Sequence, residues 1–263
     1  RYMHFVADRC DMWPHIQLNT KIVSADFQEA TGLWLVKTAG GESYTCRYFV
    51  SAMGMISEPV IPNFKGLGTF KGPCFHSARW PTEGLNYAGK RVAIIGSGAT
   101  TVQMLPVMAK TAANVTVFQR TANFIMPAVQ KPMTPEWEKD IKANYDAIVR
   151  TCRNHSFGMA FNSPVGRNLA DTPPDEVEKI LNEHWPRGSF SFVFETFDDL
   201  LGNPESNRII GEFVVRKMLE KVKDPEVREM LTPNGCPFFA KRTPVDHGYH
   251  ETVNRENVKF VDV

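Results

Sequence analysis

The sequence lacks any long apolar run. None of its hydrophobic stretches approaches the roughly 20 residues that a membrane-spanning helix needs. Its first residues, Arg1-Tyr-Met-His4, also lack the apolar core of a signal peptide. We therefore expect no membrane association and a cytoplasmic location.

The sequence also lacks an excess of charge of one sign and closely spaced pairs of cysteines. Lys and Arg number 30 and Asp and Glu 29, so the formal net charge of +1 gives no electrostatic basis for binding nucleic acid. The five cysteines are scattered at positions 10, 46, 74, 152 and 236 and form no C-x-x-C pair. We predict reduced cysteines, no disulfide framework and no metal site.

What is present indicates a globular α/β protein. The 263 residues, 43% of them hydrophobic, are enough for one large or two ordinary domains. Strands expected at 16–23, 34–38 and 44–50, with turns at Thr31-Gly32 and Gly40-Gly41, form an antiparallel meander. An apolar segment at 49–54 is expected to run as a strand into Gly54. From 57 to 89 Pro and Gly recur, which is typical of a long ordered connection.

A βαβ unit follows this connection. It consists of an expected strand at 91–95, a helix at 100–109 that Pro106 should kink or end early, and a strand at 114–118. Helices are expected at 135–152, 174–184, 207–223 and 224–231, then a loop at 236–248 and a strand at 258–263. A helical block therefore interrupts the α/β pattern.

A glycine-rich turn follows the first strand of the βαβ unit. In a G-x-G turn the glycines tighten the backbone and let it approach a pyrophosphate at the helix N-terminus. Here Thr101 replaces the third glycine, and a lone G-x-G is often only a tight turn, but the flanking strands and helix favour a dinucleotide site. The candidate cofactor-binding residues are Gly96, Ser97, Gly98, Ala99, Thr100, Thr101 and Gln103.

The end of the second strand indicates which dinucleotide binds. An acidic side chain there would favour NAD, whereas Arg120 and Thr121 offer a cation and a hydroxyl to a 2′-phosphate. We interpret this pair as an NADPH site. Alone, Arg120 could equally be a solvated cation at the end of a strand.

A twelve-residue pattern lies in the connection before the βαβ unit. Its fixed positions are Phe70, Gly72, His76, Trp80 and Pro81. Placed directly before a dinucleotide-binding turn, this spacing resembles the fingerprint of type I Baeyer–Villiger monooxygenases, which are class B flavoenzymes. We interpret His76 as a hydrogen-bonded anchor rather than an acid–base catalyst, because no ligand partner is near it in the sequence.

The resemblance covers the whole chain but only the middle of the family's sequence. It implies that 1–55 is the C-terminal part of the first FAD-domain segment, 56–89 an interdomain linker, 90–130 the first part of an NADP-binding domain, 131–232 a helical insertion and 233–263 the return to that domain. The expected fold is a Rossmann-like NADP-binding domain with a helical insertion, plus a β-meander remnant of the FAD domain. The FAD-binding Rossmann segment and the C-terminal part are expected outside this chain and would be needed for activity.

The resemblance also implies an activity, the conversion of a ketone to an ester or lactone with O2, FAD and NADPH. Lys241 and Arg242 match a pair that follows the helical insertion in the family and reaches the flavin and nicotinamide. Arg242 is thereby the candidate catalytic residue, since a fixed guanidinium stabilises anionic oxygen. Lys241 is the candidate partner of the NADP 2′-phosphate or ribose. Without the resemblance, such a pair would indicate a solvated loop.

Two positions depart from the family's pattern. Met53 stands at a threonine of the family, and Phe239 stands where glycine is frequent, which is expected to alter local backbone geometry or access to the site. An aromatic cluster is expected to pack in the core, with a share in the substrate wall as the alternative. Its members are Trp185, Phe190, Phe192, Phe194 and Phe197.

Two other functions stay open at the level of sequence. The chain could be a non-catalytic NADP-binding module without a flavin of its own. It could also belong to a related flavin monooxygenase that oxidises nitrogen or sulfur, although the pattern ending in Trp80 and Pro81 favours the Baeyer–Villiger class.

Overall fold

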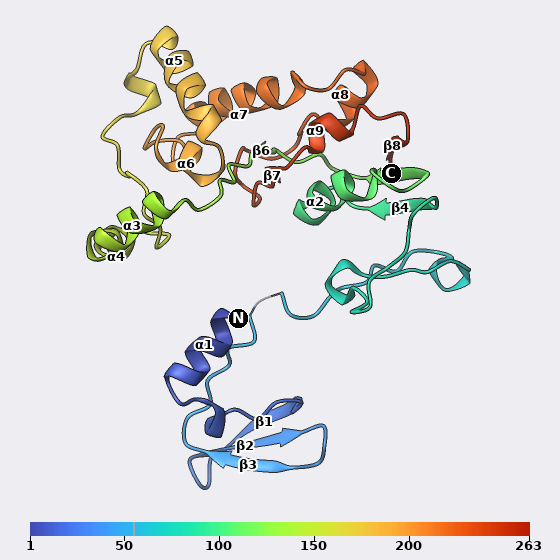
Figure 1. Cartoon of the computed structure of the whole chain (residues 1–263), viewed down its shortest axis with the longest axis vertical. Helices are drawn as coiled ribbons and strands as arrows, with labels where there is room; N and C mark the ends of the chain where they lie inside the picture. Colours follow the sequence, from blue (N-terminus) through green and yellow to red (C-terminus); the bar gives the residue numbers. More distant parts are fainter. Residues whose placement is uncertain (55) are drawn as a thin grey trace. The chain divides into compact units, whose positions relative to one another are not determined.

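The computed structural model describes residues 1–54 and 56–263, so position 55, the predicted end of the first segment, lies outside the described residues. The chain forms two compact units, Arg1–Arg79 and Trp80–Val263 (Figure 1). The division falls within the segment 56–89 predicted as a linker. The boundaries of all five predicted segments stay predictions.

The first unit contains an antiparallel sheet. Helix α1 (Tyr2–Arg9) and a 3-10 turn precede strands β1 (Ile22–Gln28), β2 (Leu33–Thr38) and β3 (Ser43–Cys46), which pair in the order β1-β2-β3 (Figure 1, blue). Gly32 and Gly41 sit in the two turns with φ of 65° and 91°, a region that glycine adopts without steric cost. The predicted meander is confirmed.

The ends of these strands differ from the prediction. The strand predicted at 16–23 is wrong over 16–21, because Asn19 has a φ of 55° and interrupts the extended backbone. The third strand ends at Cys46, which pairs with Trp34 near the start of β2, so the residues that follow have no partner in the ladder. The strand predicted at 49–54 is therefore also wrong.

The second unit is built on a parallel sheet in the order β4 (Arg91–Ile95), β5 (Asn114–Gln119) and β8 (Val258–Asp262). Strand β5 lies between the other two, and its Val115 and Val117 are fully buried. Helix α2 (Ala99–Met108) connects β4 to β5 and contributes Val102 and Leu105 to the same core. The predicted βαβ unit and the α/β fold class are confirmed.

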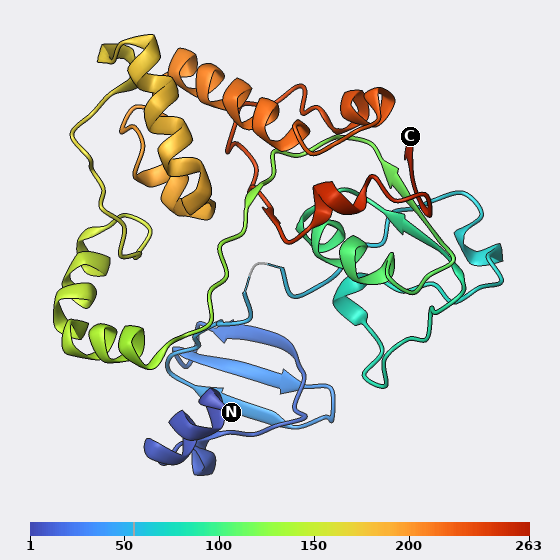
Figure 2. The same cartoon turned by 45° about the horizontal axis from the view of Figure 1, so that its top comes forward.

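A second, two-stranded parallel pairing joins β6 (Met126–Pro127) to β7 (Val245–Asp246). The loop predicted at 236–248 is wrong at β7, because pairing with a distant segment leaves no local pattern in a two-residue strand. Helix α9 (Tyr249–Thr252), which was not predicted, lies beside α2 in Figures 1 and 2 and buries Tyr249 in the core of the sheet.

Between β6 and β7 the chain is helical. The helices are α3 (Pro135–Ala143), α4 (Tyr145–Asn154), α5 (Pro174–His184), α6 (Ser189–Phe194), α7 (Pro204–Leu219) and α8 (Pro225–Leu231). The prediction of one helix at 135–152 is wrong, because Asn144 ends α3 and hydrogen-bonds Asp140 through its side chain. Helix α7 begins before the predicted 207 because Asn203 caps its first N–H groups and Pro204 occupies its first position.

Aromatic side chains form the core of this helical region. Phe192 of α6 and Phe213 of α7 stack with ring centroids 6.0 Å apart, and Trp185 meets both edge-on. Phe194 and Phe197 belong to the same buried cluster, and Phe190 packs against it. The predicted core role of this aromatic cluster is confirmed.

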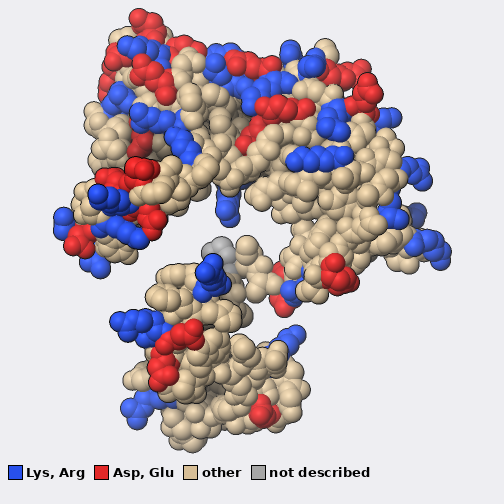
Figure 3. Space-filling view, viewed as in Figure 1, with Lys and Arg blue, Asp and Glu red and all other residues tan. Residues whose placement is uncertain are grey.

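The surface carries mixed charge. On the face shown in Figure 3, basic and acidic side chains are interspersed over the helices of the second unit, as the net charge of +1 leads one to expect. Among the described residues, no helix combines the length and apolar character that crossing a bilayer requires.

Candidate functional site

The glycine-rich turn leads from β4 into α2. Gly96 has a φ of 106°, a conformation that favours glycine, and Gly98 is the N-cap of α2 without a capping side chain. A Cβ atom built on either glycine would meet no other atom within 4 Å. The turn therefore opens onto free space in front of the first N–H groups of the helix, where an anionic group is stabilised.

Thr101 explains how the turn is held without a third glycine. Its side chain points inward, 5% exposed, and its Oγ1 donates to the carbonyl of Gly96 at 2.8 Å. The N–H of Gly96 in turn donates to the carbonyl of Phe118 on β5 at 2.8 Å. Thr101 thus stabilises the turn, while Thr100 and Gln103 are exposed near the start of α2.

Two side-chain hydrogen bonds join this turn to the segment that follows β5. Ser97 Oγ donates to the carbonyl of Thr121 at 2.5 Å, and Asn123 Nδ2 donates to the carbonyl of Ser97 at 2.8 Å. The candidate residues around Gly96 and those around Arg120 therefore lie at one edge of the sheet. Asn123 was not predicted from the sequence, because nothing in its neighbours marks it as a link between two loops.

Side chains at the end of β5 point to different sides. Gln119 is buried and its Nε2 donates to the carbonyl of Met230, so it serves packing. Arg120 is exposed and forms no ion pair with any acidic residue of the described chain. Its guanidinium is available to an anion at the edge where the turn opens.

Lys241 and Arg242 are both exposed and lie between two buried anchors. Upstream, the backbone N–H and carbonyl of Phe238 bond to Oδ1 and Nδ2 of Asn207, each at 2.9 Å. Downstream, Thr243 and Pro244 are buried, and the carbonyl of Pro244 accepts from Met126 at 3.1 Å. An exposed pair of cations is therefore fixed at both ends.

The pairing of β6 with β7 relates this pair to the first loops. Strand β6 begins three residues after Asn123, and β7 begins three residues after Arg242, in a register that pairs Met126 with Val245. Because the strands are parallel, both segments enter the pairing from the same end. Lys241 and Arg242 thus approach the pairing from the side on which Asn123 bonds to Ser97.

Asp246 holds the downstream anchor. Its Oδ1 accepts the N–H groups of Gly248 and Tyr249 at 2.7 and 2.5 Å, and its Oδ2 lies 2.7 Å from Nδ1 of His250. The side chains of Asp246 and His250 are 7% and 2% exposed. Asp246 therefore connects β7 to α9 through a buried carboxylate.

The environment shifts the pKa values of two groups at this anchor. Burial alone would raise the pKa of Asp246, but the hydrogen bond and charge of His250 and the two N–H groups outweigh it and lower this pKa below its usual 3.8. Burial, reinforced by the Asp246 charge, raises the pKa of Tyr249 above its usual 10.0. The carboxylate is thus ionised and the phenol neutral at physiological pH.

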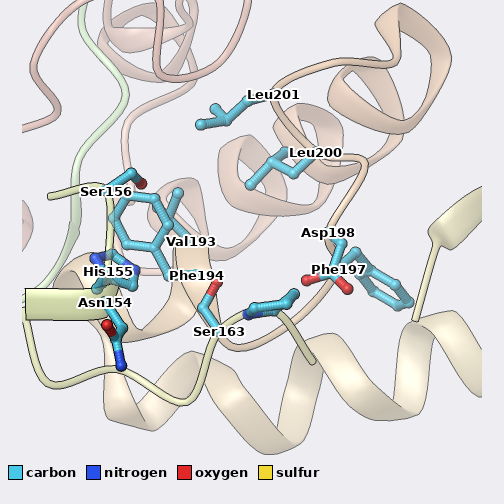
Figure 4. Close-up of a pocket in the computed structure, with 11 residues that line it drawn as sticks. Asn154, His155, Ser156, Ser163, Val193, Phe194, Phe197, Asp198, Leu200 and Leu201 are labelled. Carbon is cyan, nitrogen blue, oxygen red and sulfur yellow. The ribbon is translucent and has the colours of Figure 1, made fainter. Parts of the chain in front are cut away.

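The helical region contains a pocket of about 300 Å³ (Figure 4). Phe194 forms part of its wall beside His155, with ring centroids 5.2 Å apart. The polar side chains at the pocket include Asn154, Ser156, Ser163 and Asp198, and the apolar ones include Val193, Phe197, Leu200 and Leu201. Of the predicted aromatic cluster, Phe194 and Phe197 both pack in the core and line this pocket.

The residues of the twelve-residue pattern form local contacts. The ring of the exposed Phe70 lies over Gly72, where an added Cβ would be 2.8 Å from the far end of that ring. His76 accepts the N–H of Ala78 through Nδ1 at 3.1 Å, and Trp80 is 38% exposed. Phe70, Gly72 and His76 belong to the first unit, and Trp80 and Pro81 to the second.

We predict that replacing Asp246 by alanine lowers the free energy of unfolding at neutral pH by about 2–4 kcal/mol, because two N–H groups and His250 lose a buried charged acceptor. Since the pKa of Asp246 is lowered in the folded state, its contribution is complete above the ordinary pKa of 3.8 and is lost as the pH falls through the folded value. Urea unfolding from pH 7 to pH 3 measures both effects.

The matched control for this prediction is Glu251→Ala. Glu251 is an exposed carboxylate of the same helix and pairs with Lys221, so its removal should cost about 1 kcal/mol or less. Equal stabilities of the Asp246 and Glu251 variants at neutral pH would contradict the anchor.

Comparison with known proteins places the chain in a family. Residues 1–159 match the family model described as flavin-binding monooxygenase-like. The whole chain is 38% identical to cyclohexanone 1,2-monooxygenase from Acinetobacter sp and 36% identical to a phenazine N-monooxygenase from Lysobacter antibioticus, covering 48% of each. A crystal structure of OTEMO in complex with FAD and NADP matches all of the chain and 50% of its own, at 38% identity and a TM-score of 0.94. The chain spans about half the length of the curated relatives it matches, and it belongs to the flavin-binding monooxygenase-like family.

Proposed function

We propose that the protein containing this chain is a Baeyer–Villiger monooxygenase that uses FAD and NADPH. It converts a ketone, O2, NADPH and a proton into an ester or lactone, water and NADP⁺. The observation that carries the proposal lies at the C-terminal end of the parallel sheet. Hydrogen bonds join the Gly96 turn to the loop that follows exposed Arg120, and the pairing of β6 with β7 brings the anchored Lys241-Arg242 segment toward the same loop. The relation to cyclohexanone 1,2-monooxygenase over the whole chain supports it.

The chain's own residues fit a bound NADP. The open space before Gly96 and Gly98 leaves room for a pyrophosphate at the N-terminus of α2. Arg120 and Thr121 would hold the 2′-phosphate, and Lys241 would add a second cation for that phosphate or the ribose. OTEMO was solved with both FAD and NADP, but we assign no residue of this chain to FAD.

Arg242 is the residue to which we assign catalysis. When bound, the two cofactors supply the hydride and the oxygen-activating chemistry. Because the backbone on both sides of Arg242 is held, the position of its Cα atom is set before the reaction, and a cation placed there would stabilise negative charge on a reacting oxygen. Arginine stays protonated throughout, so it stabilises charge and does not act as a general base.

The proposal includes two statements on the setting of the protein. All five cysteines are free, which supports a reducing, cytoplasmic location. The partners are a small ketone and O2, and the remaining half of the protein is required to complete the FAD site.

We expect Arg120→Ala to raise the Michaelis constant for NADPH about 10- to 100-fold, since a charge-assisted contact to phosphate is lost. The constant for NADH should stay nearly unchanged, because NADH has no 2′-phosphate. Steady-state oxidation of both coenzymes by the full-length protein measures the ratio. The control is Arg91→Ala, which removes an exposed arginine at the opposite end of β4. An equal rise of the Michaelis constants for NADPH and NADH in Arg120→Ala would exclude the assigned role of Arg120.

We expect Arg242→Ala in the full-length protein to lower the rate of ester or lactone formation about 10²- to 10³-fold, because a preorganised charge is lost from the reacting oxygen. Gas chromatography of the products of a cyclic ketone measures this rate. Melting temperature should change little, since Arg242 is exposed. Product formation at the wild-type rate would disprove the catalytic assignment.

A second candidate function is N-oxidation. Its support is the 36% identity to a phenazine N-monooxygenase. Assays of the full-length protein with cyclohexanone and with phenazine, each followed as product rather than as NADPH consumption, separate the two. A colourless full-length protein that binds NADPH and oxidises neither would instead support a non-catalytic NADP-binding module.

A further inference from the structure

Phe239 has a backbone conformation that side chains rarely adopt. Its φ is 64°, in the left-handed region. It is the third residue of a turn closed by a hydrogen bond from the N–H of Ala240 to the carbonyl of Pro237 at 3.2 Å. In turns with a positive φ at this position the favoured residue is glycine. A bulky residue here is strained, so something else must hold it.

The turn directs two consecutive rings to different neighbours. Phe238 is 2% exposed and packs edge-on against Phe124 at 5.3 Å between centroids, close to Gly211 of α7. Phe239 instead meets Phe190 and Phe194 of α6 edge-on, at 5.8 and 6.2 Å. The positive φ of Phe239 is thus offset by the packing of both rings, each on a different element.

The packed ring of Phe239 is close to the exposed cations in sequence. Ala240 alone separates it from Lys241, and the turn that contains Phe239 ends at Ala240. Asn207 holds the backbone of Phe238 and the hydrogen bond of Ala240 closes the turn, so the ring of Phe239 is the side-chain contact within the turn that is nearest in sequence to Lys241. The partner ring, Phe194, is also part of the pocket wall in Figure 4.

We propose that Phe239 is a positioning residue: its ring, clamped against α6, sets the direction of the Lys241-Arg242 segment. The effect of this clamp on NADP binding rests on the proposed function. The clamp itself does not, because it concerns only how firmly the segment is held.

The test compares three variants of the full-length protein. Phe239→Ala keeps the strained backbone and loses the ring, Phe239→Gly relieves the strain and loses the ring, and Phe239→Leu keeps the strain and an apolar side chain. Melting temperature should depend on the backbone strain at position 239, so the glycine variant should melt at a higher temperature than the alanine variant. The position of the Lys241-Arg242 segment should depend on the side chain at 239. The alanine and glycine variants should therefore behave alike, and the leucine variant should stay close to the wild type.

Positioning is measured by limited trypsin digestion of the native protein, because trypsin cleaves after Lys241 and after Arg242. We expect cleavage there to become about tenfold faster in the alanine and glycine variants, as local opening becomes easier. The affinity for NADP⁺, measured by calorimetry without turnover, should fall in the same two variants. Phe161→Ala is the matched control, since Phe161 also packs on Phe194 but is not joined to the cationic segment.

Each outcome has one reading. The proposal would be overturned if cleavage rate and affinity simply followed melting temperature, so that the glycine variant was cleaved more slowly and bound NADP⁺ more tightly than the alanine variant. Phe239 would then be a stabilising residue only. Equally fast cleavage at 241–242 in Phe161→Ala would also overturn it. If the wild-type protein oxidised no ketone, the proposed function would fail, while the cleavage rates would still decide the clamp.

Discussion

The second unit depends on β5 being hydrogen-bonded along both edges. Strand β4 precedes it closely in sequence and pairs through a short crossover, but β8 pairs with it only after the whole helical region has been traversed. Without β8, the N–H and carbonyl groups on that edge of β5 would need other partners. The turn at Gly96 and the Arg120 loop take their places from this sheet, and the segment that follows Arg120 leads into β6, which pairs with β7 after Lys241-Arg242.

The β6–β7 pairing cannot account for the return of the chain by itself. Closing a flexible loop of about 120 residues costs on the order of 4 kcal/mol in chain entropy. The two hydrogen bonds that Met126 and Ala128 donate contribute about 1 kcal/mol each. Other contacts also hold the returning chain, among them the packing of Phe238 on Phe124, the buried Asp246 carboxylate and the pairing of β8 with β5.

The sequence predicts those parts of the fold whose cause is local. The βαβ unit follows from apolar runs and a glycine turn, and α5 from its proline start, so both were found at their positions. The strand at 16–21 failed because a single left-handed Asn19 outweighs apolar spacing. The strand β7 and helix α9 could not be predicted, because pairing with Met126 and packing on α2 decide them.

The same division applies to the candidate site. Gly96, Arg120 and Arg242 are visible in the sequence because motifs carry them, whereas Asn123, Asn207 and Asp246 act through hydrogen bonds to residues that are distant or unremarkable in sequence. The role of Thr101 lies between these cases. Its departure from glycine is evident in the sequence, but only its bond to the carbonyl of Gly96 explains why the turn tolerates it.

The side-by-side entry and exit of the helical region at β6 and β7 have an evolutionary consequence. Because the chain leaves and re-enters the sheet at paired residues, insertions or substitutions among α3 to α7 do not change the distance that the insertion must span. The pocket in that region can therefore diversify while the edge of the sheet stays the same. Within such an architecture, the helical region can vary in length and lining, while the constraint on sequence concentrates on the residues at its two ends and on those of α6 and α7 that contact Phe239 and Phe238.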